Sequence, residues 1–450
     1  MLSVLRNRAY RHLFTAQVIA LVGTGLATVA LGLLAYDIAG PRAGSVLGTA
    51  LAIKMVAYVA IAPAIGAVAH RVPRRALMAG SDLTRAAVAL ALPFVDQVWQ
   101  VYVLIFALQA ASAAFTPTFQ AVIPDVLPKE RDYTQALSLS RLAYDMESLF
   151  SPALAAALLT FMSYNWLFLG TVGGFLASAT LVVSVVLPKP APVPEPAGGA
   201  YAKATAGSLL FFRVPRLRAL LCLNLAVAAA SALVTVNTVV YVRDHLSRPT
   251  GDVAFALGAY GGGSMLVALL LPRILDRVAD RTVMLAGALL LPVVFAAVGL
   301  VTAASQGSWR WPALLGTWAA FGAACSMVLT PTGRVIRRSV PPEERTPAFA
   351  AQFSLSHAAW LITYPLAGWV GASAGLLSAV VALGAIGLIA AVSAVRLWPA
   401  RDAEDSPHVH TGLAAGHPHL DGAVEVPGGW RHRHVPACDE LHLAGASVTR

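Results

Sequence analysis

The stretch Gly66-Ala-Val-Ala-His-Arg-Val-Pro-Arg-Arg75 separates two long apolar runs, and an altered copy of it returns later in the chain. The second copy reads Pro272-Arg-Ile-Leu-Asp-Arg-Val-Ala-Asp-Arg281, at an offset of 206 residues. A short basic cluster between two apolar runs is typical of a loop on the cytoplasmic side of a membrane protein. Two such copies indicate a chain built from two related halves.

Further matches follow in the same order, with slowly growing offsets. Thr116-Pro-Thr118 recurs as Thr330-Pro-Thr332, Pro128-Lys-Glu-Arg131 as Pro342-Glu-Glu-Arg345, and Ser138-Leu-Ser140 as Ser354-Leu-Ser356. Each half holds six apolar runs, and six is an even number, so both halves begin on the same side of the membrane. The sequence therefore predicts a parallel repeat about an axis normal to the membrane, with the transport path between the halves.

Composition supports the same architecture. The 450 residues are 58% hydrophobic and 12% charged, whereas a soluble chain carries roughly 25% charged residues. Apolar runs long enough to span a bilayer are expected near 13–36, 46–69, 76–95, 98–120, 134–159, 166–187, 219–241, 252–272, 282–303, 311–333, 348–370 and 375–397. We expect an all-α membrane protein with twelve transmembrane helices in two parallel six-helix halves.

Charge in the loops predicts the orientation, because basic residues favour the cytoplasmic side. A cytoplasmic N-terminus places on that side Arg71, Arg74, Arg75, Lys129, Arg131, Arg273, Arg277, Arg281, Arg334, Arg337, Arg338 and Arg345. The opposite loops hold Arg42, Arg243, Arg248 and Arg310. The net charge of +10 is thus loop charge, which indicates no nucleic-acid partner. We expect a multi-pass protein of the bacterial inner membrane with both termini cytoplasmic.

The segments outside the spans differ in composition. Residues 188–218 open with PKPAPVPEPAGG, and proline at this density predicts a stiff, extended cytoplasmic linker without helix. The linker joins an N-terminal half, 1–187, to a C-terminal half, 219–397. From 398 to 450 the apolar pattern stops, and we expect a disordered cytoplasmic tail.

These loops resemble the major facilitator superfamily, whose signature after the second span is a glycine, three residues, an Asp-Arg pair and further basic residues. The matching positions here are Gly66, His70, Arg71, Arg74 and Arg75, and in the second copy Asp276, Arg277 and Arg281. The resemblance implies a cytoplasmic latch that steadies the outward-facing state. His70 replaces the acid of the first copy, which would make that latch sensitive to pH because imidazole titrates near neutrality. The opening Leu5-Arg-Asn-Arg-Ala-Tyr-Arg-His-Leu13, and Asp82 with Arg85, are similar to the drug:proton antiporter branch. The resemblance covers about residues 1–398.

Charged residues within the spans are costly and by default functional or paired. Asp82 and Arg85 are three residues apart and can pair, either as a structural anchor or as part of coupling. In the fifth span, Arg141 and Asp145 lie four residues apart on one helical face. Glu147 points about 200° away from Asp145, so it must find its partner on another helix.

The repeat makes the acids of the fifth span more informative. At the offset of 216 residues, Arg141 aligns with His357, while Asp145 and Glu147 align with Leu361 and Thr363. Carboxylates present in one half suit a proton-coupled cation carrier, and a structural network with Arg141 is the alternative. His357 is either a functional group or a packing residue.

Other polar positions leave two interpretations open. Lys54 either lines the pathway or pairs with an acid, and Asn224 and Asn237 either line the pathway or join helices by hydrogen bonds. The resemblance leads us to expect a Gly-Pro-x-x-Gly-Gly motif in the fifth span. The chain has Ser-Pro-Ala-Leu-Ala-Ala over 151–156 instead, whose small residues still permit close helix approach.

The tail concentrates seven of the eleven histidines. Candidate metal ligands are His408, His410, His417, His419, His432, His434, Cys438 and His442. Six of the histidines form His-x-His pairs, which in an extended chain place two imidazoles on one side, and imidazole suits divalent nickel, zinc, copper and cobalt. The spacing matches no folded zinc module, so labile binding is expected. A solvated tail with incidental histidines is the alternative.

This combination resembles the nickel-resistance exporters of the superfamily, through Tyr144-Asp-Met-Glu-Ser-Leu-Phe-Ser-Pro152, Leu271-Pro-Arg-Ile-Leu-Asp-Arg277 and the tail. The resemblance implies export of nickel, with cobalt as a further cargo, by proton antiport. An exporter of organic drugs or siderophores, with a regulatory or incidental tail, is the alternative, and a membrane metal sensor that does not transport is a third. We expect no enzyme activity and no cofactor. The expected partners are membrane lipid, the divalent ion and the proton, and we expect a monomer.

Overall fold

The computed structural model describes residues 2–39, 43–68, 72–188, 200–249, 251–399, 408–410, 424–427 and 429–432. The N-terminal half consists of α1 (Arg8–Ala39), α2 (Ala43–Val68), α3 (Arg74–Ala91), α4 (Val98–Val126), α5 (Glu130–Leu159) and α6 (Tyr164–Val183). The C-terminal half consists of α8 (Pro215–Val240), α9 (Asp252–Leu275), α10 (Asp280–Ala303), α11 (Arg310–Leu329), α12 (Thr332–Ser339), α13 (Arg345–Ala374) and α14 (Leu376–Leu397). Helix α7 (Ala200–Arg213) lies between the halves in sequence.

Shorter elements complete the description. There are 3-10 turns η1 (Leu2–Arg6), η3 (Leu92–Phe94) and η5 (Pro342–Glu344), and a π-helical turn η4 (Tyr241–His245) that extends α8. Three strands follow in the tail: β1 (His408–His410), β2 (Val424–Val426) and β3 (Gly429–His432).

The expected membrane architecture is confirmed. Within the described residues, twelve helices are at least 18 residues long, enough for about 27 Å of rise, and nine spans are long and apolar enough to cross a membrane. The remaining three long helices, α2, α5 and α13, all lie where the halves meet. Exposed aromatic side chains near the connections α3–α4, α5–α6 and α10–α11 include Phe94, Trp99, Phe161, Trp166 and Trp309, which is the pattern of an interfacial aromatic belt.

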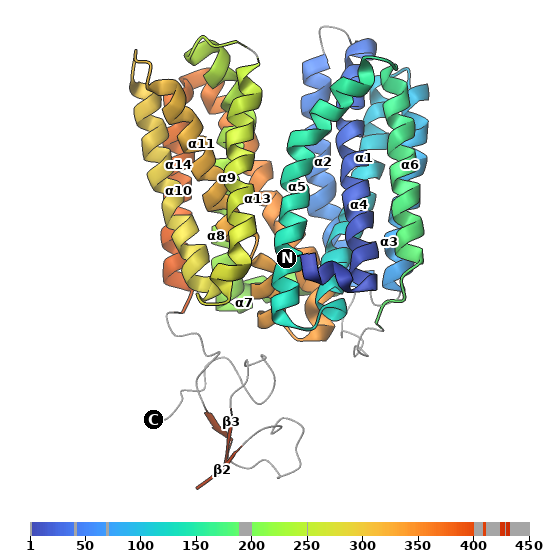
Figure 1. The fold of residues 1–450 in the computed structure, drawn as a ribbon, viewed down its shortest axis with the longest axis vertical. Helices are drawn as coiled ribbons and strands as arrows, with labels where there is room; N and C mark the ends of the chain where they lie inside the picture. Colours follow the sequence, from blue (N-terminus) through green and yellow to red (C-terminus); the bar gives the residue numbers. More distant parts are fainter. Residues whose placement is uncertain are drawn as a thin grey trace.

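The two halves stand side by side along the long axis (Figure 1). They meet along two seams, one between α2 and α13 and the other between α5 and α9. The N-terminal turn η1 and the described strands of the tail lie toward one end of the bundle, which we call the termini end; the other is the far end. The loops at the termini end are those that carry the basic repeats.

Close helix approach depends on glycine at two places. A Cβ at Gly263 of α9 would overlap the backbone of Ala319 on α11, and one at Gly322 of α11 would overlap the Tyr260 carbonyl on α9. In the N-terminal half, a Cβ at Gly25 of α1 would overlap the Ser151 side chain of α5. At Ser151, the first of the small residues of 151–156, α5 can approach α1 closely because residue 25 of α1 is a glycine.

The prediction that the linker contains no helix is wrong. Residues 200–213, expected to be extended, form helix α7, and α8 begins at Pro215 rather than near 219. The physical reason lies in the distribution of proline, because the prolines before α7 end at Pro196 and the following Ala-Tyr-Ala-Lys-Ala-Thr-Ala is free to form a helix. Pro215 occupies the first turn of α8, where proline is tolerated.

The tenth expected span is also modified. Helix α11 ends at Leu329 and α12 begins at Thr332, whereas the matching Pro117 lies within the continuous helix α4. The repeated Thr-Pro-Thr therefore breaks the helix in one half and not in the other.

The tail was predicted to be disordered, but its described residues form β-strands. These form an antiparallel sheet in the order β1-β3-β2. Two residues, Pro427 and Gly428, stand between β2 and β3, and a Pro-Gly pair is a turn signal that favours a tight hairpin.

Candidate functional site

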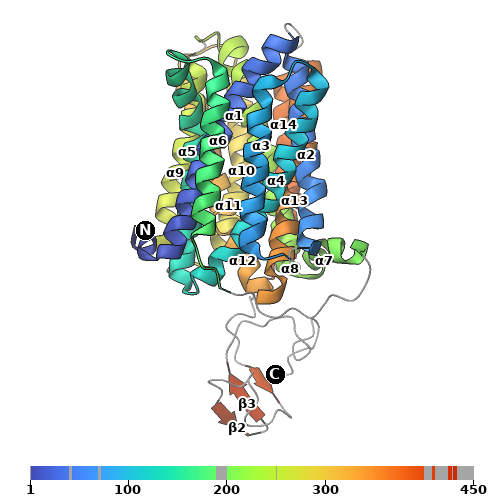
Figure 2. The ribbon, with the colours of Figure 1, turned by 90° about the vertical axis from the view of Figure 1, so that its right-hand side faces the viewer.

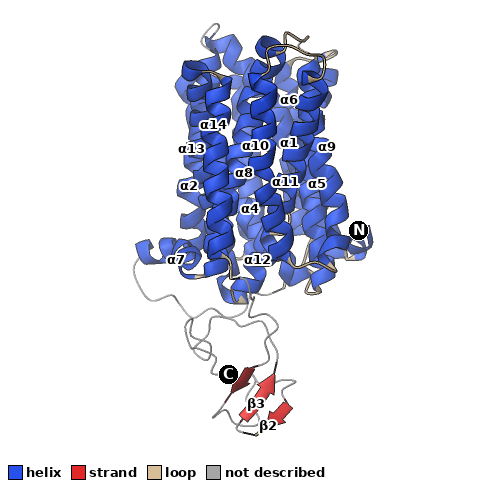
Figure 3. Cartoon of the chain, turned by 90° about the vertical axis from the view of Figure 1, so that its left-hand side faces the viewer, coloured by secondary structure: helices blue, strands red, loops and turns tan. Residues whose placement is uncertain are grey.

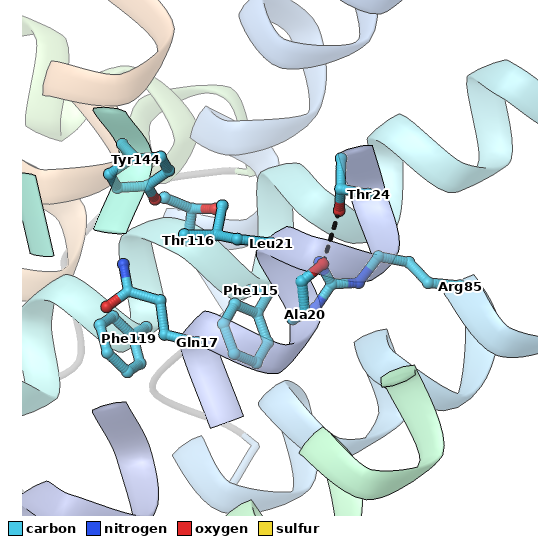
Figure 4. A pocket seen from close by; sticks show the side chains of 9 residues that line it. All are labelled: Gln17, Ala20, Leu21, Thr24, Arg85, Phe115, Thr116, Phe119 and Tyr144. Carbon is cyan, nitrogen blue, oxygen red and sulfur yellow. Dashed lines mark hydrogen bonds between the residues drawn. The ribbon is translucent and has the colours of Figure 1, made fainter. Parts of the chain in front are cut away.

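A pocket opens within the N-terminal half between α1, α3, α4 and α5, and Figure 4 shows its lining side chains. Its cavity volume is about 30 Å³, room for a water molecule or two and well below the roughly 300 Å³ at which small-molecule sites begin. The lining residues are Gln17, Ala20, Leu21, Thr24, Arg85, Phe115, Thr116, Phe119 and Tyr144. Aromatic rings and aliphatic groups thus make its walls, while amide and hydroxyl groups offer a few hydrogen bonds.

Arg85 forms part of this lining and is 5% exposed. It pairs with Asp82, as the sequence predicted, and Asp82 also accepts a hydrogen bond of 2.7 Å from Ser178. The guanidinium carbon lies 4.6 Å from the ring centroids of both Phe115 and Phe175. Its Nε has no hydrogen-bond partner among the described residues. The pair anchors α3 to α6, and it also leaves one donor beside the pocket.

The second predicted pair forms a junction between the halves. Arg141 Nη2 lies 2.8 Å from Asp145 Oδ1, one helical turn away on α5. Across the seam, Ser264 of α9 donates a 2.6 Å hydrogen bond to the other Asp145 oxygen and accepts hydrogen bonds from Arg141. Asp145 is buried. Its carboxylate therefore connects α5 to α9 at mid-depth of the bundle, a role that the sequence did not reveal.

Glu147 occupies a different environment. Its carboxylate lies against Gly25 of α1, and Lys54 of α2 is the cation that acts on it electrostatically. The two do not form an ion pair in the structure, and the Lys54 ammonium lies 5.7 Å from the ring centroid of Tyr58. Glu147 is thus half-buried, with a cation within electrostatic range on a neighbouring helix.

His357 of α13 is packed in an aromatic cluster at the other seam. Its ring centroid lies 4.6 Å from that of Tyr58, 4.3 Å from Phe353 and 4.9 Å from Trp360. Its Nδ1 contacts the Phe353 carbonyl at 2.6 Å. Tyr58 donates a 2.7 Å hydrogen bond to Gln109 of α4. His357 therefore packs between the halves, and the Lys54 ammonium acts on it as well.

The two asparagines of α8 join helices. Asn224 donates to Gln352 at 3.2 Å, and Asn237 donates to the Ala367 carbonyl at 3.3 Å. Both acceptors belong to α13, so these residues hold the C-terminal half together, which was the alternative to a pathway role.

At the termini end, Asp125 at the end of α4 joins two arginines. Arg74, at the start of α3, lies 2.5 Å from one oxygen, and Arg345, at the start of α13, lies 2.9 Å from the other. Asp125 thus connects the first loop signature to the opposite half.

A second ion-pair group occupies the corresponding place in the C-terminal half. Arg334 and Arg338 of α12 each lie 3.0 Å from Asp280 at the start of α10. Both also contact Glu130 at the start of α5 in the other half, at 3.1 and 2.5 Å respectively. The break between α11 and α12 sets these arginines on a short helix at the seam.

The expected latch residues play smaller parts. Gly66 lies at the α2–α13 seam close to Ala350, Arg75 donates to the Val185 carbonyl at 3.4 Å, and Arg281 donates to the Trp398 carbonyl at 3.4 Å. Asp276 contacts Arg131 of the other half at 3.6 Å in an exposed pair, and Arg277 is exposed. His70 and Arg71 lie outside the described residues.

Sequence reasoning missed the acids of the termini end. Asp125 and Glu130 join the halves through Arg345, Arg334 and Arg338, and Asp280 holds Arg334 and Arg338 within the C-terminal half. Asp280 lies in the second copy of the repeat, four residues after Asp276, and it is Asp276 that matches the family signature. Burial separates the two, because Asp280 is buried and Asp276 is exposed.

The candidate metal residues of the tail are described in part. His408 and His410 lie on β1 and His432 on β3, and the register pairs His408 with His432 and His410 with Trp430. His417, His419, His434, Cys438 and His442 lie outside the described residues. In the described part of the chain, tail strands included, His, Cys, Asp and Glu side chains form no group of three able to hold a metal ion.

Comparison with known proteins defines the family. The Major Facilitator Superfamily model matches residues 13–291 and, in a second match, 220–432. The uncharacterized MFS-type transporter YfiS of Bacillus subtilis is 25% identical over 389 residues, covering 84% of this chain and 91% of that one. Macrolide efflux protein A of Streptococcus pyogenes is 27% identical over 183 residues, 39% of this chain and less than half of that protein.

Solved structures show the same fold. A human organic anion transporter superposes with a TM-score of 0.71 at 14% identity, over 86% of this chain and 99% of that one. A bacterial homologue of the iron transporter ferroportin, in an outward-facing state, superposes with a TM-score of 0.69 at 16% identity, over 86% and 99%. With its two six-helix halves, its two seams and these matches along its length, the chain belongs to the Major Facilitator Superfamily.

Proposed function

We propose that this transporter is a secondary active exporter of organic solutes that exchanges them for protons. It acts as a monomer in the bacterial inner membrane, with the termini end in the cytoplasm. The observation that carries the proposal is the pocket of α1, α3, α4 and α5, which offers aromatic walls with a few amide and hydroxyl groups. The chemistry of that lining, rather than its volume in this structure, suits an organic molecule with an apolar body and hydrogen-bonding groups, and a bare divalent ion would find no carboxylate, imidazole or thiol among its lining residues.

The two carboxylates of α5 take separate roles in this proposal. Asp145 is engaged by Arg141 and Ser264, so it fixes the relation between the halves. Glu147 makes no ion pair within the described structure and lies within range of the Lys54 charge, which suits a group that gains and loses a proton during the cycle. A protonated Glu147 and a bound substrate would then alternate.

The ion pairs at the termini end support an outward-facing state. Asp125–Arg345 and Glu130–Arg338 hold the halves together where the cytoplasmic loops are expected. For the site to open to the cytoplasm, these pairs must separate.

The experiment measures exchange in everted membrane vesicles. Ethidium and erythromycin serve as organic probes, and a fluorescent amine reports the pH gradient. Addition of a transported probe should dissipate part of the gradient in vesicles with the wild-type protein. Glu147→Gln should reduce this dissipation at least tenfold while the protein still binds the probe. Glu344→Gln, an exposed acid at the termini end, is the matched control and should behave as wild type.

Two outcomes would count against the proposal. If the wild-type protein neither dissipates the gradient with any organic probe nor lowers probe accumulation in cells, organic export is wrong. If Glu147→Gln exchanges as well as wild type, the coupling role of Glu147 is wrong, and Asp145 becomes the carboxylate to test.

Export of nickel or cobalt is the second candidate, favoured by the register of the tail sheet. In an antiparallel pair, directly opposed residues and residues two apart on one strand share a face. The positions 408, 410 and 432 therefore share one face of the sheet, and histidine is a residue type that nickel and cobalt accept as ligand.

Nickel accumulation in growing cells distinguishes the candidates. Under the metal hypothesis, the wild-type protein lowers cell nickel, Asp145→Asn raises it, and deletion after 400 weakens protection only partly. Under the organic hypothesis none of these proteins changes nickel accumulation, and the tail deletion leaves exchange of the organic probe unchanged.

A further inference from the structure

Helix α7 lies crosswise at the termini end and projects past the side of the bundle (Figures 2 and 3). It packs against α2 of the N-terminal half and against α8 and α13 of the C-terminal half. A Cβ at Gly207 would overlap the Pro347 carbonyl, so α7 is held tightly against the start of α13. Its position relative to the bundle is therefore set by packing.

The two sides of α7 differ in exposure. Gly207 and Phe211 face the bundle and are buried. Leu209 and Phe212, three residues apart, are 46% and 56% exposed, and the neighbouring Arg213 is exposed. A crosswise helix with this exposed apolar edge and an adjacent cation has the form of an interfacial helix.

Charge indicates what covers this edge. Residues 200–218 contain Lys203, Arg213, Arg216 and Arg218 and no acidic residue. A basic segment next to the ends of membrane spans is attracted to anionic phospholipids. The same end of the bundle carries the basic loops, so the helix lies at the level of the lipid headgroups.

We propose that α7 is an interfacial helix that binds the anionic phospholipid surface. Leu209 and Phe212 insert at the boundary between headgroups and acyl chains, and Arg213 contacts lipid phosphate. The helix thereby holds the α2–α13 seam at a fixed depth in the membrane. This inference does not depend on which solute the protein exports.

The test places a fluorescent label on this edge in proteoliposomes. In a background carrying Cys222→Ser, Cys325→Ala and Cys438→Ser, single Leu209→Cys and Phe212→Cys variants receive an environment-sensitive fluorophore. Vesicles are made of phosphatidylcholine alone or with phosphatidylglycerol, and the quenchers are aqueous iodide and a lipid with a shallow nitroxide. Arg131→Cys, an exposed position at the same end, is the control.

We expect labels at 209 and 212 to be quenched at least threefold more by the nitroxide lipid than the label at 131, and to be protected from iodide. Phosphatidylglycerol should increase the lipid quenching, and Arg213→Gln should reduce that increase. Iodide quenching equal to that at 131 would overturn the proposal. So would lipid quenching independent of phosphatidylglycerol, or protection that appears only at protein concentrations where two copies associate.

Discussion

Asp145 shows how one side chain can serve two levels of structure. Its bond to Arg141 is local to α5, while its bond to Ser264 joins the halves. Removing one partner of a buried ion pair costs far more than removing a neutral hydrogen bond, because a charge remains buried without compensation.

Asp145→Asn should therefore lower the free energy of unfolding by about 3 kcal/mol. Ser264→Ala should lower it by less, about 1–2 kcal/mol, since the ion pair persists while the hydrogen bond to Asp145 and those from Arg141 are lost. Thermal unfolding of the purified proteins in detergent gives the order of the two. Equal losses would show that the inter-half hydrogen bond, rather than the ion pair, dominates.

At the scale of elements, the contact between α1 and α5 depends on the absence of a side chain at Gly25. Ser151 occupies the space that a Cβ would need, and the Glu147 carboxylate lies beside it. Overpacking a tight helix contact forces a shift of the backbone or of neighbouring side chains. The glycine therefore determines how closely Glu147 lies to α1.

Gly25→Ala should destabilise the protein by about 1–3 kcal/mol, measured by thermal unfolding. Adding Ser151→Gly should restore most of the loss, because it removes both atoms that overlap. Gly173→Ala on α6 is the matched control, since a Cβ there meets nothing within 4 Å. A loss at position 173 as large as that at 25 would show that helix packing is not the cause.

At the scale of the whole molecule, the two halves carry opposite charges at matching places. The base Arg74 begins α3 and pairs with the acid Asp125, while the acid Asp280 begins α10 and pairs with the bases Arg334 and Arg338. Across the halves, Asp125 contacts Arg345. Glu130 contacts both Arg334 and Arg338. Both contacts between the halves therefore pair an acid with a base and are attractive.

Glu130→Gln should favour opening of the termini end. Loss of the Glu130 charge removes about 1 kcal/mol of the attraction that favours the closed state, a value kept small because Glu130 is partly exposed. This change raises the ratio of open to closed molecules about fivefold. Distances between spin labels at positions 131 and 277 report the opening. Glu344→Gln should leave the distances unchanged, and an unchanged distribution in Glu130→Gln would show that the Asp125–Arg345 contact suffices.

The sequence alone predicted the twelve-helix fold, the two halves and the pairs Asp82–Arg85 and Arg141–Asp145. Each depends on local information: the length of an apolar run, a repeat along the chain, or a spacing of three or four residues on one helix. It failed at α7 and in the tail, where proline-rich or polar composition obscured a helix and a hairpin.

The tertiary structure decided which distant residues meet. Asp125 with Arg345, Glu130 with Arg338 and Asp145 with Ser264 join residues more than a hundred positions apart. Such contacts depend on the rotation of each helix about its axis and on the alignment of one half against the other. Packing across the seams sets both quantities, and no spacing within a single helix contains them.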